Sequence, residues 1–386
     1  MSDPMRFDYC VVGAGSAGYA AANTARNLGK TVAIVDAPGP LGGLCILRGC
    51  MPSKTLLRSS EVVHLVRTAP EVGIETQGVH VDFPHIAARK RRIIKDFADD
   101  RAAGIEKFPL FRGNARFVAR DAIGVDGQTI AAERFLIATG SVVNVPNVPG
   151  LHESGFVTTD DVLDYETLPR SVIVLGGGAS ACELGQYLGR LGVETTIVQR
   201  SKTLLSGEDE DVALSLAENL ERDGIRIITG ATITAVDAGV AGKNVHYSRD
   251  GKPHSVAAAE IFAALGRRAN VDGLSLDTAG VEFDRHGVKV NAYLQTSNPI
   301  VYAAGDVIHE SSQLVHVAVR DGELAAANAF ASSPTKVDER LEQARAIFTD
   351  PQVAVAGLTE KECRARGIDY ARASYPFDDL GKAIAV

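Results

Sequence analysis

Mainly apolar runs that end in glycine-rich turns recur along this chain. Residues 7–12 and 171–175 have strand length, and each is followed at once by three glycines within six residues. A helical pattern of small or apolar residues comes next in both places, and a second apolar run follows, at 31–35 and 195–198. This order is typical of a buried βαβ unit. Two such units predict an α/β protein with two Rossmann-like domains.

The segments between these units alternate between helical and strand patterns. Helical spacing continues to about Phe108, and a later helix is predicted at 315–330. An Asp126-Gly127 pair between short alternating runs predicts a hairpin turn. The Pro-rich stretch 145–150 predicts a linker, and a further unit begins near residue 343. Strands are predicted at 115–119, 122–125, 128–131, 134–138, 226–229, 232–236, 244–247, 261–265 and 300–304.

The first glycine turn carries a dinucleotide-binding fingerprint. It reads Gly13-Ala14-Gly15-Ser16-Ala17-Gly18, and the second strand of its unit ends in Asp36. Glycines permit a tight turn and close approach to a pyrophosphate, the helix N-terminus favours its charge, and the acid suits a ribose diol. With both strands and the acid in place, the sequence predicts a dinucleotide here.

The second turn, Gly176-Gly177-Gly178-Ala179-Ser180-Ala181, differs from the first at one informative position. Asp36 lies 23 residues after Gly13, and the same interval from Gly176 leads to Gln199, which is followed by Arg200 and Lys202. A missing carboxylate beside two cations suits a 2′-phosphate, so NADP(H) is favoured over NAD(H). The alternative is that both cations are merely exposed.

Two cysteines, Cys45 and Cys50, lie in a glycine-rich loop that runs into a helical pattern. If Pro52 takes the first helical position, Cys50 lies just outside the helix N-terminus, where the dipole favours a thiolate. Such a pair suits a redox dithiol. A zinc site, a structural disulfide and two inert thiols remain as alternatives, although no second pair of ligands at zinc spacing exists.

Composition restricts the partners. The chain has 386 residues, 45% of them hydrophobic and 23% charged, which is enough for two or three domains. Its net charge of −8 argues against nucleic acid, and the basic run 89–92 is expected to be a solvated helix face. No apolar run has membrane-spanning length and no signal peptide is recognised, so we expect no membrane partner and a cytoplasmic location.

With these motifs placed, the chain resembles the pyridine nucleotide-disulfide oxidoreductases, the FAD flavoenzymes that include glutathione reductase, dihydrolipoamide dehydrogenase and mercuric reductase. The similarity covers nearly all residues from Phe7 to Val386. It is carried by the first fingerprint with Asp36, the Cys45-to-Lys54 segment, Ala138-Thr139-Gly140, the second glycine turn with Glu183, Ala303-Ala304-Gly305-Asp306 and Phe348-Thr349-Asp350-Pro351. This resemblance favours the redox interpretation of the dithiol and argues against the zinc site.

The resemblance implies specific roles. Cys50 is expected to be the charge-transfer thiolate next to the flavin, Cys45 to exchange with substrate, and Lys54 to pair with Glu183 near the flavin. The implied FAD-binding residues are Gly13, Gly15, Ser16, Ala17, Gly18, Asp36, Gly43, Lys54, Ala115, Thr139, Gly140, Gly305, Asp306 and Val315. The implied NAD(P)-binding residues are Gly176, Gly178, Ala181, Glu183, Gln199, Arg200 and Gly266.

The resemblance also implies a domain plan and a reaction. An FAD domain (1–150 and 270–335) holds an inserted NAD(P)H domain (151–269), and a partial α+β interface domain (340–386) follows, with a homodimer expected where that domain is complete. Electrons would pass from NAD(P)H through FAD to the Cys45–Cys50 disulfide and then to a disulfide or related acceptor. The alternatives are a diaphorase or quinone-type reductase and a redox sensor without turnover.

Four departures from the family pattern modify this expectation. Ala179 stands where some members place an aromatic gate, and residues 46–49 read Ile-Leu-Arg-Gly where Val-Asn-Val-Gly is commoner. The mercuric reductases' closing metal-binding module has no counterpart, which argues against mercury as substrate. No histidine follows His316, so the family's acid/base histidine is missing, and we expect slow turnover of disulfides beside faster turnover of quinones.

Overall fold

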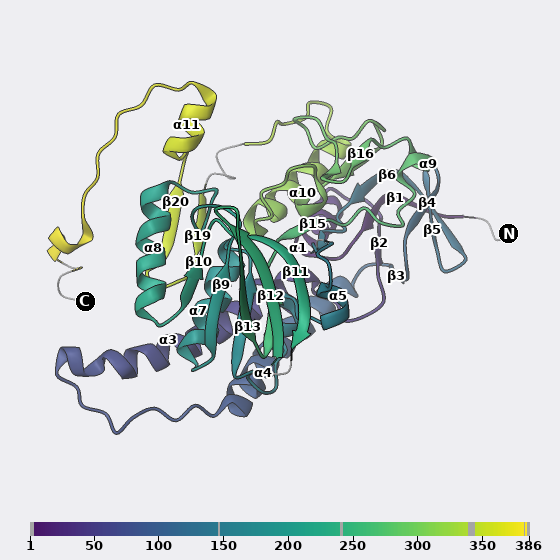
Figure 1. Ribbon diagram of the computed structural model, residues 1–386. Helices are drawn as coiled ribbons and strands as arrows, with labels where there is room; N and C mark the ends of the chain where they lie inside the picture. The colour runs from purple at the N-terminus through teal and green to yellow at the C-terminus, as the bar shows by residue number, and fades with distance from the viewer. Residues whose placement is uncertain (1–3, 146, 240–241, 339–343, 382, 384–386) are drawn as a thin grey trace.

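The computed structural model describes residues 4–145, 147–239, 242–338, 344–381 and 383 (Figure 1). Its first unit is built on a seven-stranded sheet in the order β3-β2-β1-β6-β5-β4, with β18 also pairing with β6. The pairs among β1, β2, β3, β6 and β18 are parallel, whereas β4, β5 and β6 form an antiparallel meander. The strands are β1 (Met5–Val12), β2 (Val32–Asp36), β3 (Leu110–Arg112), β4 (Arg116–Ala119), β5 (Ala122–Val125), β6 (Gln128–Ile137) and β18 (Val301–Ala303).

Helices cover one face of this sheet. α1 (Ser16–Asn27) and α10 (Val315–Phe330) pack there through alanines, together with the end of α4 (Phe83–Ile105). The opposite face packs against residues 274–290 and 305–308, which include α9 (Leu276–Ala279), β16 (Phe283–Asp284), β17 (Gly287–Val288) and η2 (Gly305–Val307). Both faces of the parallel strands are therefore buried, as their continuous apolar runs predict.

The second unit has a four-stranded parallel sheet in the order β10-β9-β8-β14. One face packs against α7 (Ala179–Arg190) and α8 (Glu210–Arg222), and the other against an antiparallel sheet of β11, β12 and β13. The strands are β8 (Ser171–Leu175), β9 (Glu194–Val198), β10 (Arg226–Ile228), β11 (Thr232–Gly239), β12 (Gly242–Arg249), β13 (Lys252–Ala258) and β14 (Glu260–Ala263), and the short helices α5 (Leu151–Ser154) and α6 (Thr159–Leu163) precede them.

The chain enters and leaves this second unit through two neighbouring strands. β7 (Ser141–Val143) pairs antiparallel with β15 (Arg267–Ala269), and Val143 faces Arg267 across the ladder. The second sheet therefore lies, along the chain, between two strands that pair with each other. This topology is compatible with the predicted inserted domain, whose boundaries remain a prediction. Within the predicted linker 145–150, Pro146 lies outside the described residues.

A third segment comes after α10 in the chain and packs against the second unit, where Figure 1 shows it beside α8. It contains β19 (Ala344–Ile347), β20 (Val353–Ala356), α11 (Glu360–Arg366) and η4 (Phe377–Asp379). Ile347 and Val353 join the same apolar cluster as α7 and α8. The start of the predicted interface domain, 340–343, and its last residues, 384–386, lie outside the described residues.

The structure corrects several predicted elements. The predicted strands 128–131 and 134–138 form the single strand β6, because β1 pairs with it in one constant register between Ile130 and Ile137. β3 and β13 were not predicted, since the first is very short and the second is largely exposed. The basic run is not a wholly solvated face: Lys90 is 5% exposed and its Nζ lies 2.5 Å from Asp164 Oδ1.

Candidate functional site

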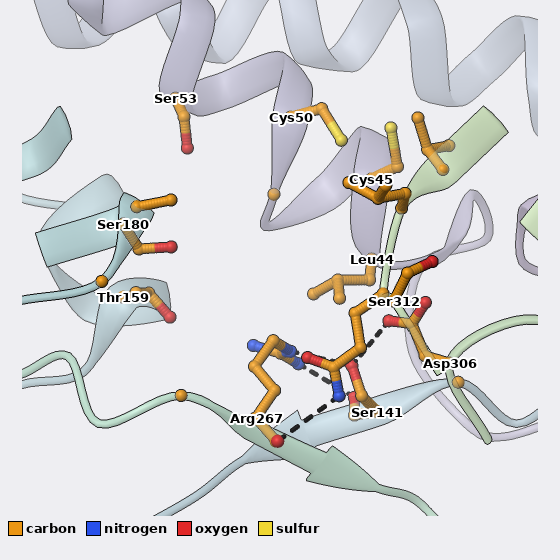
Figure 2. Close-up of a pocket in the computed structure, with 18 of the residues that line it drawn as sticks. Leu44, Cys45, Cys50, Ser53, Ser141, Thr159, Ser180, Arg267, Asp306 and Ser312 are labelled. Atoms are coloured by element: carbon orange, nitrogen blue, oxygen red, sulfur yellow. Dashed lines mark hydrogen bonds between the residues drawn. The ribbon is translucent and has the colours of Figure 1, made fainter. Parts of the chain in front are cut away.

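A cavity of about 920 Å³ lies at the carboxyl ends of strands from both sheets. Both glycine-rich turns, both cysteines of the dithiol and the ends of several strands line it. Figure 2 shows the two sulfurs on one side of this cavity, with Arg267, Ser141 and Asp306 on the other. Because ligands of open α/β sheets bind at the carboxyl ends of the strands, this is the expected position for the predicted dinucleotides.

The first glycine turn is shaped for a close ligand. Gly13 has a φ of +103°, and a Cβ there would lie 2.3 Å from Ala138 O, so only glycine fits. Helix α1 begins at Ser16 without a side-chain cap and without an acidic residue in its first turn, which leaves its N-terminus available to an anion. The backbone and the helix end at this turn fit the pyrophosphate of a dinucleotide such as FAD.

Asp36 is held at the end of β2, beside the first turn. Its Oδ1 accepts a hydrogen bond of 2.8 Å from the Ala14 N–H, and its Oδ2 lies 3.9 Å from the Arg112 guanidinium. Burial raises the pKa of Asp36, and the Ala14 amide and Arg112 partly offset this rise. One carboxylate oxygen is thus tied to the turn while the residue still lines the cavity.

The second turn repeats this geometry without the acid. Gly176 has a φ of +109°, and a Cβ there would lie 2.5 Å from Ala264 O. Helix α7 begins at Ala179, again without a side-chain cap or an acidic residue in its first turn. Gln199 lines the cavity where Asp36 does in the first unit, and its Oε1 accepts from the Arg200 N–H at 3.1 Å. The second turn therefore also fits a pyrophosphate.

The dithiol lies at the junction of two helices, α2 (Gly43–Leu47) and α3 (Cys50–Thr68). Helix α3 begins at Cys50, so the prediction that Pro52 takes the first helical position was wrong: Pro52 is the third residue, where it also gives up no helical hydrogen bond. Both thiols are free. Cys50 thus belongs to the first turn of a 19-residue helix.

The two sulfurs differ in acidity. The hydrogen bond from the Cys45 thiol lowers the pKa of Cys50 to about 7, helped by its own backbone N–H and Lys54, while burial and Asp306 oppose the change. Donating that hydrogen bond, together with burial, raises the pKa of Cys45 well above its usual range. This difference supports Cys50 as the thiolate, a role that remains a prediction.

Lys54 lies one turn after Cys50 and connects three segments. Its Nζ is 2.7 Å from Glu183 Oε2 on α7 and 4.2 Å from the centre of the Phe348 ring, and the Phe348 N–H donates to Glu183 Oε1 at 2.8 Å. The predicted contact of Lys54 with Glu183 is therefore present. Phe348, which follows β19, was not expected to take part.

Helix α7 continues this contact along one buried face. Gln186 and Arg190, which are 3% and 6% exposed, follow Glu183 at helical spacing. The Gln186 amide exchanges hydrogen bonds with the backbone of Asp350, and the Arg190 guanidinium binds the carboxylates of Asp223 and Asp350 at 2.8 Å each. This face of α7 holds the segment from Phe348 to Asp350.

Most predicted site residues lie together. Nearly all of the predicted FAD and NAD(P) residues line the cavity, as do both cysteines, and the exceptions are Gly18, Ala115, Ala181 and Arg200. Gly18 and Ala181 act beneath the turns, where Gly18 packs against Gly13 O and Ala181 is fully buried. Ala115 packs against the core of the first sheet, and Arg200 is exposed beside Gln199.

Several lining residues were not predicted. Arg267 donates to Ser141 Oγ and Ser141 O at 2.9 Å each, and Ser141 Oγ lies 2.8 Å from Asp306 Oδ2. Arg48, between the cysteines, is 3.5 Å from Asp160. Arg267 follows the Gly266 strand ending, a signal that could have found it. Glu208 and Arg345 also line the cavity, and no local motif marks them.

Among the described residues, no cluster of three or more His, Cys, Asp or Glu side chains is arranged to hold a metal ion. No helix in the described ranges combines the length and the apolar composition that crossing a bilayer requires.

Family models and individual relatives place the chain in the same family. The family model of the pyridine nucleotide-disulphide oxidoreductases matches residues 7–322, and that of the family's dimerisation domain matches residues 343–386. The chain is 35% identical to a mercuric reductase of Bacillus cereus over 98% of its own length, and it spans 60% of that relative. It is 32% identical to a dihydrolipoyl dehydrogenase of Bacillus subtilis (strain 168), of which it spans 82%.

A solved structure confirms the fold. The HOCl-induced flavoprotein disulfide reductase RclA from Escherichia coli, in its Cu(II) complex, superposes with a TM-score of 0.86 at 24% identity, covering 98% of this chain and 83% of that one. The family match over most of the chain and the shared fold lead to one conclusion. The chain belongs to the pyridine nucleotide-disulphide oxidoreductases, a family of FAD-binding oxidoreductases.

Proposed function

We propose that this protein oxidises NAD(P)H and passes the electrons through FAD to the Cys45–Cys50 disulfide, and from there to a disulfide or a related acceptor. The observation that carries the proposal is that both glycine-rich turns and the dithiol line one cavity. Two dinucleotide sites that share a space with a redox pair allow electrons to move between them without diffusion of an intermediate carrier.

When bound, NAD(P)H and FAD would supply the two-electron transfer that reduces the disulfide. The chain's own residues then carry out the thiol chemistry. Two electrons and one proton convert the Cys45–Cys50 disulfide into a Cys45 thiol and a Cys50 thiolate, a distribution that the difference in pKa favours. Lys54, held by Glu183, places a positive charge one helical turn from the thiolate.

The oxidative half uses Cys45 as nucleophile. After losing its proton, the Cys45 sulfur attacks one sulfur of an acceptor disulfide, forming a mixed disulfide and releasing the first thiolate. The Cys50 thiolate then attacks Cys45, which reforms the internal disulfide and releases the second thiolate. The two released thiolates take up two protons, the one lost by Cys45 and one from solvent, so that one acceptor disulfide becomes two thiols for each pair of electrons and the dithiol returns to its oxidised state.

NADP(H) is the proposed electron donor. Gln199 replaces the acid that would bind a ribose diol, and within the described residues the side chains of Arg200 and Lys202 form no hydrogen bond or ion pair. Two such cations beside the end of β9 suit a 2′-phosphate. The proposed acceptor of these electrons is a disulfide or a related compound.

An acceptor screen tests this function. The wild type, Cys45→Ser and Cys50→Ser would be assayed for NADPH oxidation with a disulfide panel, with quinones and ferricyanide, and without acceptor. We expect both variants to lose disulfide reduction and to keep ferricyanide reduction, which needs only the flavin. Equal quinone turnover in all three proteins without disulfide turnover would indicate the diaphorase, and no turnover with any acceptor would indicate a redox sensor.

A further inference from the structure

The loop between β9 and α8, residues 199–209, covers the second glycine-rich turn. A Cβ at Gly177 would lie 2.8 Å from Leu204 Cδ2 and 3.0 Å from Gln199 Cγ, so the loop packs directly on this turn. The Leu205 N–H donates to Gly177 O at 2.7 Å. The cavity lining includes the end of this loop, from Leu205 to Glu208. The position of the loop therefore shapes the cavity at this turn.

This loop does not take its conformation unaided. Leu205 has a φ of +44°, in the left-handed region that a residue with a Cβ avoids, and it is nevertheless 4% exposed. Conformations of this kind persist where the surroundings over-determine them. The Glu208 N–H donates to Leu205 O at 2.7 Å and closes the turn, so whatever fixes Glu208 also fixes Leu205.

Glu208 is fixed from the third segment of the chain. Arg345 on β19 donates to Glu208 Oε1 from Nε at 2.8 Å and to Oε2 from a terminal nitrogen at 2.7 Å. Both side chains are mostly buried, with 22% of Arg345 and 10% of Glu208 exposed, and both line the cavity. A two-pronged contact of this kind sets the orientation of the carboxylate as well as its distance.

We propose that Arg345 is a positioning residue for the nicotinamide coenzyme: through Glu208 it holds residues 204–208 against the second glycine-rich turn, so the third segment forms part of the coenzyme site. This proposal rests on the proposed function, in which that turn binds NAD(P)H. It gives the segment matched by the dimerisation model a second role within one chain.

Neighbouring contacts offer a matched control. The same segment also binds the start of α8 through Arg372, whose guanidinium is 2.7 Å from Asp211 Oδ2. These two side chains are 53% and 57% exposed, and neither lines the cavity. If Arg345 merely attaches the third segment, its loss and the loss of Arg372 should have similar consequences. If it positions the loop, only its loss should weaken coenzyme binding.

The test compares Arg345→Leu, Arg345→Lys, Glu208→Gln and Arg372→Leu as FAD-loaded enzymes. Binding of NADP⁺ and of NAD⁺ to the oxidised proteins would be measured by calorimetry, together with KM and kcat for the reduced coenzymes with ferricyanide. We expect Arg345→Leu and Glu208→Gln to raise the Kd of the preferred coenzyme about tenfold with little loss of kcat, because a misplaced loop costs binding geometry. Arg345→Lys should recover part of the affinity, and Arg372→Leu should stay within about twofold of wild type.

The outcomes separate this proposal from the function on which it rests. A wild type that binds neither nucleotide would remove the coenzyme site and this proposal together. A wild type that binds one of them, with an unchanged Kd in Arg345→Leu, would remove this proposal alone. Similar losses in Arg345→Leu and Arg372→Leu would show that the ion pair only attaches the segment. Bound FAD and the melting temperature, measured on every variant, identify any that fails to fold; Arg345→Lys and Glu208→Gln, which preserve side-chain size, then decide the question.

Discussion

At the scale of single residues, Cys45 and Cys50 form one hydrogen-bonded pair, yet the pKa values of their thiols differ. The difference in pKa comes mainly from the hydrogen bond that the Cys45 thiol donates to Cys50, and the backbone N–H of Cys50, in the first turn of α3, adds to it. Since the pKa of Cys50 is lowered from 9.0 to about 7, its thiolate is the main form above that pH and is lost as the pH falls through about 7.

This acidity can be measured in the reduced holoprotein. A thiolate next to oxidised FAD gives a long-wavelength absorption band, and we expect the band to appear on anaerobic two-electron reduction and to be half-maximal near pH 7. Cys50→Ser should lack the band at every pH, whereas Cys45→Ser should show it even before reduction. A band that survives in Cys50→Ser and is missing from Cys45→Ser would reverse the assignment of the two sulfurs.

Arg200, an exposed side chain, is the proposed determinant of coenzyme choice. We expect Arg200→Ala to lower kcat/KM for NADPH about tenfold or more and to leave NADH nearly unchanged, because a charge-assisted contact with a 2′-phosphate is worth roughly 1.5–3 kcal/mol. Arg249→Ala, an exposed arginine on β12, is the control. Equal losses for both coenzymes would remove the NADP(H) assignment.

The first glycine turn gives a prediction about FAD. Gly13→Ala adds a Cβ 2.3 Å from Ala138 O, whereas Gly29→Ala places one in open space at a similar positive φ of +77°. We expect Gly13→Ala to lose most of its FAD and Gly29→Ala to keep it at a cost of about 1 kcal/mol in stability. The ratio of flavin to protein absorbance measures the FAD content of each variant. Full FAD retention in Gly13→Ala would contradict the assignment of FAD to the first glycine turn.

At the scale of elements, α7 joins several parts of the molecule through its contacts. Its buried polar face contacts α3 and the Phe348–Asp350 segment, so one helix connects the dithiol side, the second sheet and the third segment. Arg190→Leu should cost about 3 kcal/mol in the free energy of unfolding, because the mostly buried Asp223 carboxylate loses its guanidinium partner and keeps only its contacts with Gln186 and His64. Arg320→Leu removes an arginine that is 65% exposed and should stay within about 0.5 kcal/mol. Chemical denaturation measures the free energy of unfolding of both variants. Similar losses in the two would refute the structural role of the buried face of α7.

The elements also show what the sequence could and could not predict. Both fingerprints, α10 and the Asp126-Gly127 hairpin are local, so spacing and residue type are enough to find them. The start of α3 was misplaced because Pro52 is tolerated anywhere in the first turn. The contact of Arg345 with Glu208 joins residues 137 positions apart and has no motif. Contacts of this kind depend on how the units pack against each other. The spacing of apolar residues along the chain does not predict that packing.

At the scale of the whole molecule, the third segment presents apolar side chains to solvent. Tyr375 is 64% exposed and Phe377 is 77% exposed, within the residues that match the dimerisation model. We expect a homodimer, detected by sedimentation as twice the chain mass of 40.7 kDa. Phe377→Asp should shift the equilibrium toward the monomer, whereas Leu28→Asp on the surface beside α1 should not. A wild type that stays monomeric at all concentrations would contradict this expectation.

The pairing of β7 with β15 has a consequence for engineering and for evolution. Because these strands are neighbours, with Val143 facing Arg267, residues 144–266 leave and rejoin the first unit about 5 Å apart. A cassette with its two ends so close can be exchanged as a block at the level of the gene. We expect a chimaera that carries the corresponding cassette of a relative to inherit that relative's electron donor while keeping its own flavin and cysteines. Adaptation to a new supply of reducing power would then need one recombination event rather than many point substitutions.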